Sequence, residues 1–143
     1  MFLSVLLGNC EVWPFVTKAD IKRLESCDSQ FLAQAMGISS KCSYVLMLLE
    51  GGIIPIRHSI ITRRLNYLHC LLKSDKNSSL AKQVFLKQAE NPKKEDFTTQ
   101  VLADLNEFEI YLSLNEIEKL SKYKFKKIVK RACMKSAFNY LLN

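Results

Sequence analysis

Apolar residues recur along most of this chain at intervals of three and four, which is the spacing of one face of an α-helix. Strict alternation of apolar and polar residues, which predicts strands, is missing, and only 4 glycines and 3 prolines interrupt the pattern. The sequence therefore predicts an all-α fold, an irregular bundle of about six to seven helices. Since 143 residues suffice for one compact core and hardly for two, we expect residues 1–143 to form a single helical domain.

Local signals place the first two long helices. Thr17 precedes an acid at Asp20, and this pair predicts a capping box for a helix from about residue 18 to residue 36. Ser43 precedes a short helix over residues 44–49 that is almost entirely apolar. Because such a helix is buried on most sides, we expect it to be the centre of the core.

A rigid break precedes the next helix. Gly51 and Gly52 end the apolar helix, and Pro55 fixes the restart of a helix over about residues 56–73. The positions predicted to face inward are Ile60, Ile61, Leu65, Leu68, Leu71 and Leu72, while Arg57, Arg63 and Arg64 lie at or beyond the edges.

Three further helices follow. One ends near Ala89, one opens at Asp96, and Ser113 with Glu116 forms a second capping box. The last helix spans roughly residues 122–142, and its lysines crowd the face opposite the core. Its predicted inward residues are Phe125, Ile128, Val129, Ala132, Ala137, Tyr140 and Leu141.

Charge is distributed unevenly along the chain, whose formal net charge is +7. Residues 90–118 hold eight acidic residues against two lysines, whereas the basic C-terminal helix, residues 119–143, holds eight basic residues and no acid. Clustered cations gain free energy by releasing counterions from phosphates, so this segment favours a polyanionic partner.

Catalytic and metal-binding patterns are missing. His58 and His69 would lie ~16 Å apart on one helix, and no Ser, Cys or carboxylate motif accompanies either, so both are interpreted as structural or surface histidines rather than general bases. The five cysteines form no Cys-x-x-Cys pair, so we expect reduced thiols, most of them buried, and no zinc. We expect no enzyme activity, no cofactor, no metal and no small-molecule substrate.

The N-terminal segment is interpreted as part of the fold. Residues 1–7 are apolar, but they lack a basic leader and a cleavage site and are too few to span a bilayer, so a packed helix is expected. Trp13 is interpreted as a helix-docking anchor. The features together predict an intracellular protein, nuclear or cytoplasmic.

Nucleic-acid binding is the chemistry that the residues favour. Arg57, Arg63 and Arg64 can hold phosphates, and Tyr67 can stack beside them. The alternative is that Arg63 and Arg64 cover the core and pair with acids of residues 90–118. The C-terminal helix adds Lys122, Lys126, Lys127, Lys130 and Arg131. A membrane is not expected as its partner, because its apolar face is needed for the core.

Several short motifs occur in order along nearly the whole chain. They are Leu6–Trp13, Val16–Asp20, Leu24-Glu25, Gly37–Ser39, Leu49–Arg57, Arg63–His69, Leu112–Ile117 and Ser121–Lys126. Together they resemble the region downstream of the polymerase domain in non-LTR retrotransposon reverse transcriptases. Two departures are an inserted Asn9 before Cys10, which affects the packing expected of Trp13, and Asn115 where an acid is common.

The resemblance implies a fragment of a longer retroelement polyprotein, whose polymerase carries an aromatic-x-Asp-Asp metal site. Adjacent aspartates do not occur in this chain, so it holds no such pair for two-metal nucleotidyl transfer. The implied role is a non-catalytic helical extension that steadies RNA or DNA. Two alternatives remain open: a protein-interaction or scaffold domain whose charges pair internally, and an inert retroelement remnant.

Overall fold

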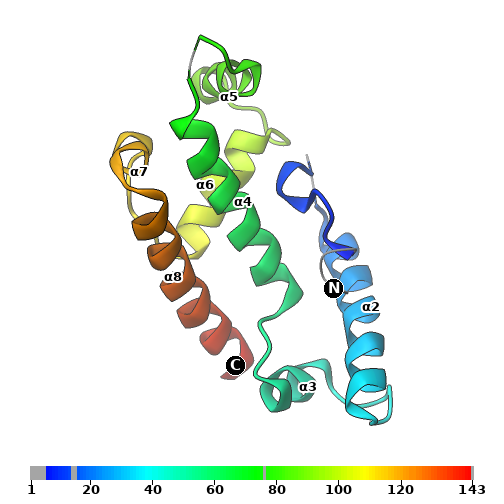
Figure 1. Ribbon diagram of the computed structural model, residues 1–143. Helices are drawn as coiled ribbons and strands as arrows, with labels where there is room; N and C mark the ends of the chain where they lie inside the picture. The colour runs from blue at the N-terminus through cyan, green and yellow to red at the C-terminus, as the bar shows by residue number, and fades with distance from the viewer. Residues whose placement is uncertain (1–5, 14–15, 76, 143) are drawn as a thin grey trace.

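The computed structural model describes residues 6–13, 16–75 and 77–142, and these ranges contain helices and no strand (Figure 1). Its elements are the short 3₁₀-helix η1 (Cys10–Val12) and seven α-helices: α2 (Lys18–Met36), α3 (Tyr44–Gly51), α4 (Ile56–Lys73), α5 (Leu80–Glu90), α6 (Phe97–Glu107), α7 (Leu114–Lys119) and α8 (Lys122–Leu142). The predicted all-α class is confirmed. The helix expected over residues 1–7 lies largely outside the described residues.

Helix α4 is the centre of the bundle. It contacts η1, α2, α5, α6, α7 and α8, and Figure 1 shows it running between α8 on one side and α2 on the other. Ten of its 18 residues are buried, including all six positions predicted to face inward. The core therefore forms around the helix that follows the Gly-Gly break.

Helix α3 was expected to be that centre, and this prediction was wrong. Met47 and Leu48 are buried against α2, but Leu46 and Leu49 expose 55% and 46% of their surface. A helix of eight residues at one end of the bundle meets neighbours on one side only, so its apolar composition does not produce burial all round. The apolar composition of α3 indicates that the helix packs against its neighbours, but it does not indicate how many of its faces are covered.

The two predicted capping boxes are confirmed. At the start of α2 the Asp20 amide donates to Thr17 Oγ1 at 3.1 Å, and the Thr17 amide donates to the Asp20 carboxylate at 2.9 Å. The corresponding distances at α7 are 3.3 Å for the Glu116 amide and 2.7 Å for the Ser113 amide. These bonds satisfy backbone donors that the helix itself leaves free.

A tyrosine connects three helices where α4 begins. The Tyr44 hydroxyl, from α3, donates to Asp28 Oδ2 of α2 at 2.7 Å and accepts the backbone N–H of Ile56 at 3.3 Å. Burial raises the pKa of Asp28, and the bond from Tyr44 acts in the opposite direction. Tyr44 thus satisfies a buried carboxyl group and a free amide at the N-terminus of α4.

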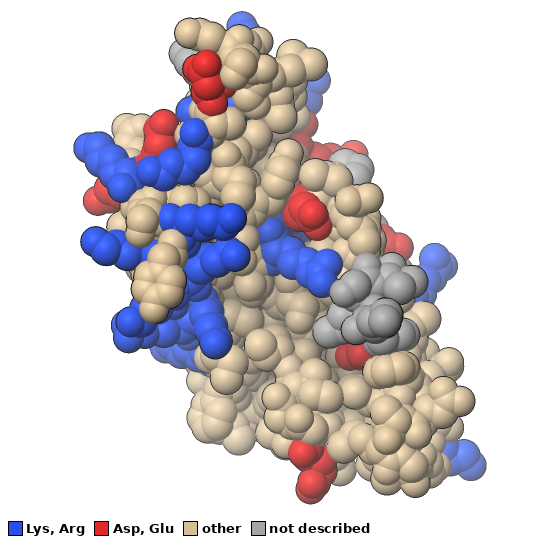
Figure 2. Space-filling view, in the orientation of Figure 1, with Lys and Arg blue, Asp and Glu red and all other residues tan. Residues whose placement is uncertain are grey.

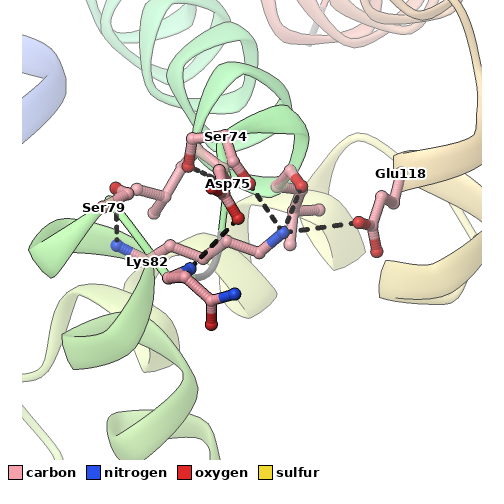
Figure 3. A network of polar contacts seen from close by, with 8 residues as sticks. Ser74, Asp75, Ser79, Lys82 and Glu118 are labelled. Atoms are coloured by element: carbon pink, nitrogen blue, oxygen red, sulfur yellow. Dashed lines mark hydrogen bonds and ion pairs between the residues drawn. The ribbon is translucent and has the colours of Figure 1, made fainter.

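A lysine closes the other end of α4 (Figure 3). Lys82 of α5 exposes 8% of its surface, and its Nζ donates to the carbonyl oxygens of Leu72 at 2.7 Å and Ser74 at 3.0 Å. Glu118 of α7 completes the group at 3.4 Å. A cation is favoured there because the carbonyl end of a helix carries partial negative charge. Lys82 therefore joins α4, α5 and α7.

Helix α8 packs on α4 through one narrow row. Phe125, Val129, Cys133 and Ala137 recur at intervals of four and are all buried. Tyr140 was expected to face inward as well, but it is 41% exposed. Because the row advances by four residues while a helical turn takes 3.6, the buried face drifts around α8 and leaves Tyr140 at its edge.

Candidate nucleic-acid interface

The side of α8 turned away from the core carries the cations predicted from the sequence. Figure 2 shows Lys and Arg side chains gathered over this helix. We call the exposed members of this group the α8 basic face: Lys122, Lys124, Lys126, Lys127, Lys130 and Arg131. The buried row of α8 fixes their direction, since residues between members of that row must point to solvent.

The charges of the α8 basic face are left uncompensated. Within the described part of the chain, none of its six members forms an ion pair, whereas Lys135 further along α8 pairs with Glu109. Exposed cations held on one rigid helix are suited to phosphate groups, because each already points to solvent and needs no partner removed.

An exposed aromatic residue lies among these cations. Tyr123 is 75% exposed, and helical spacing puts it on the same face as Lys127 and Lys130. Tyr67, the aromatic residue predicted to stack, instead packs its ring edge-on against Phe97 with 5.9 Å between centroids. The place of Tyr123 between Lys122 and Lys124 in the sequence is the signal that could have made it a candidate for base stacking.

The three predicted arginines do not share one site, because Arg57 and Arg64 line one pocket and Arg63 lines another. Arg57 pairs with Glu107 at 2.8 Å and remains 46% exposed in its side chain. Arg63 donates to the Leu7 carbonyl at 3.1 Å and, together with Lys130, lines a pocket between α4 and α8. Arg63 is thus the arginine that adjoins the α8 basic face.

Arg64 does not lie at the edge of α4, where it was predicted. It is 2% exposed, and its guanidinium pairs at 2.6 Å with Asp104 of α6, so it cannot present its charge to a phosphate in this conformation. Burial raises the pKa of Asp104 to about 6, although the neighbouring Arg64 acts in the opposite direction. The alternative expectation, pairing with an acid of residues 90–118, is confirmed for Arg64.

Both histidines are buried, so the surface position that the sequence left open is excluded for them. His58 is 2% exposed, lies 3.1 Å from Ser136 Oγ and stacks on Phe108; burial lowers its pKa to about 4. His69 Nε2 donates to a backbone carbonyl at 2.8 Å, and its ring stacks on Phe125. Each imidazole is thus held by a ring contact and by a polar contact with another element.

The cysteines are less buried than expected. Cys10 and Cys133 are buried, but Cys27 and Cys70 are exposed, so the prediction that most are buried was wrong.

No three His, Cys, Asp or Glu side chains of the described ranges gather in a group that could hold a metal ion. Trp13 packs against the cluster formed by η1 and α4, in agreement with its interpretation as an anchor.

Comparison of the chain with models of protein families, with curated proteins and with solved structures gives no match. Among the described residues, no single helix has both the length and the apolarity of a membrane span. Only α3 and α4 taken together meet that requirement, and they are bent by 64° at the break between them.

Proposed function

We propose that this chain is a non-catalytic helical module, derived from the C-terminal region of a non-LTR retrotransposon reverse transcriptase, that binds the backbone of RNA or DNA. The α8 basic face is the observation that supports the binding. The motifs that resemble the retroelement proteins support the origin. Arg63 extends the surface from α8 onto α4, whereas Arg57 and Arg64 are engaged in ion pairs with acidic residues of α6.

The mechanism of binding is electrostatic. Each lysine or arginine that meets a phosphate releases condensed counterions, so the logarithm of the binding constant falls linearly with that of the salt concentration. If all six members of the α8 basic face engage a single strand, the slope is about −4. Tyr123 adds a surface on which a base can stack.

Salt-dependent binding of labelled single-stranded and duplex oligonucleotides tests this proposal. The variant Lys126→Glu/Lys127→Glu/Lys130→Glu should lose binding and keep its urea midpoint, because these lysines make no ion pair in the described structure. A matched control reverses three exposed lysines elsewhere: Lys41, Lys73 and Lys94. No binding at micromolar protein, or affinity insensitive to salt, would refute the proposal.

A second candidate is a protein-interaction domain with internally paired charges. The pairs Arg57–Glu107 and Lys135–Glu109 favour it, because both connect basic positions to the acidic segment. Exposed apolar residues on α5 also favour a protein-interaction domain. Leu80 and Val84 expose 73% and 46% of their surface beside an apolar pocket. The same lysine variant separates the two candidates: a loss of stability supports internal pairing, and a loss of binding alone supports a nucleic-acid ligand.

A further inference from the structure

A small pocket opens between Leu7, which precedes η1, and the helices α4 and α8, next to the α8 basic face. Its volume is about 230 Å³, below the range of about 300–1,000 Å³ that is typical for drug-sized ligands. Leu7, Ile54 and Cys133 give it largely apolar walls. The pocket therefore has room for a single small ring system.

Cations lie on two sides of this pocket. Arg63 lines it from α4, where its bond to the Leu7 carbonyl fixes the guanidinium, and Lys130 lines it from α8. Lys122 and Lys126 precede Lys130 at intervals of four, so the three form one row along α8 with about 5–6 Å between successive Cβ atoms. A phosphate backbone that follows this row would reach the pocket at Lys130.

A hydroxyl group in the pocket wall lacks a strong partner. Thr62 Oγ1 is buried, and no oxygen or nitrogen of the described residues meets hydrogen-bond geometry with it. The group with which it interacts is the thiol of Cys133, a weak hydrogen-bonding partner. Ser59 also lines this pocket. Because Thr62 Oγ1 lies beneath the pocket surface, a ring in the pocket would be held chiefly by contact with the apolar walls.

We propose that the pocket takes one unstacked base of a single-stranded nucleic acid, with Arg63 and Lys130 binding phosphates on either side of that nucleotide. This inference rests on the proposed function and adds to it a preference for single strands. An apolar slot between two cations matches the alternation of ring and phosphate along a strand. The bases of an intact duplex are stacked and paired, and therefore cannot enter.

The test uses single-stranded oligonucleotides with one abasic position or one 2-aminopurine, whose fluorescence rises when it leaves the stack. The intact strand should bind the unaltered protein about tenfold more tightly than the abasic strand, within the range expected for one base contact. The 2-aminopurine signal should rise on binding. Duplex affinity should be weaker than single-strand affinity.

Two variants separate the pocket from simple stacking on α8. Ser59→Phe should fill the pocket and abolish both the abasic penalty and the fluorescence rise, whereas Tyr123→Ala should weaken binding of intact and abasic strands alike and so retain both signals. Ser40→Phe, at an exposed position between α2 and α3, is the matched control for an added aromatic ring. If Ser59→Phe fails to fold, the abasic and fluorescence measurements on the unaltered protein decide the question.

The outcomes distinguish the two proposals. Equal affinity for intact and abasic strands, or a penalty that disappears in Tyr123→Ala and persists in Ser59→Phe, overturns the pocket proposal while backbone binding stands. Failure of the unaltered protein to bind any strand overturns both.

Discussion

Replacing His58 by phenylalanine should change how the stability of the protein depends on pH. The imidazole is buried between α4 and α8, and burial lowers its pKa from 6.5 to about 4. The unfolded chain therefore binds a proton between pH 6.5 and pH 4 that the folded protein does not, so acidification destabilises the fold. The linkage relation gives a decrease in the free energy of unfolding of about 2 kcal/mol at pH 5 and about 3 kcal/mol at pH 4.

Urea unfolding at intervals from pH 4 to pH 7.5 measures the effect. The His58→Phe variant keeps a ring that can stack on Phe108 but has no group that takes up a proton. Its free energy of unfolding, relative to that of the unaltered protein, should therefore increase by about 3 kcal/mol between pH 7 and pH 4. Ser136→Ala removes the hydroxyl near the imidazole and keeps the titrating group, so it should retain the pH dependence. A difference that stays constant across this range would refute a neutral, buried His58.

Other predictions concern the polar contacts that hold the helices together. Asp104→Ala should cost about 3–5 kcal/mol in urea unfolding, because it leaves the Arg64 charge buried and unpaired, and Arg64→Met/Asp104→Leu should recover most of that loss. Lys82→Met should cost about 1–3 kcal/mol, since two carbonyls at the end of α4 lose their donor. Ser113→Ala should cost about 1 kcal/mol through the lost cap of α7, seen as a lower melting temperature.

Features set by neighbouring residues were predictable from the sequence. The capping boxes at Thr17 and Ser113 depend on residues three positions apart, and the inward face of α4 follows from its own periodicity. The direction of the α8 lysines was predictable for the same reason. In each case the deciding interactions lie within one or two helical turns.

Features set by distant residues were not predictable. Arg64 follows Ile60 by four positions and therefore lies in the buried row of α4, but its partner Asp104 is 40 residues away. The positive charge of Arg64 predicted an exposed side chain. Its burial depends on the Asp104 carboxylate, which comes close to it only in the folded chain. The pocket beside Arg63 depends in the same way on Leu7 and on residues from α4 and α8, which no local pattern connects.

The packing of α4 against α8 has a consequence for translation. His58 meets Ser136, 78 residues later, so a ribosome adding about 5–20 residues each second needs roughly 4–16 s to supply that partner. During this interval the apolar side of α4 that α8 later covers is open to chaperones. Helix α8 both covers the apolar side of α4 and carries the α8 basic face. The nascent chain therefore buries its core and forms its basic surface in the same step.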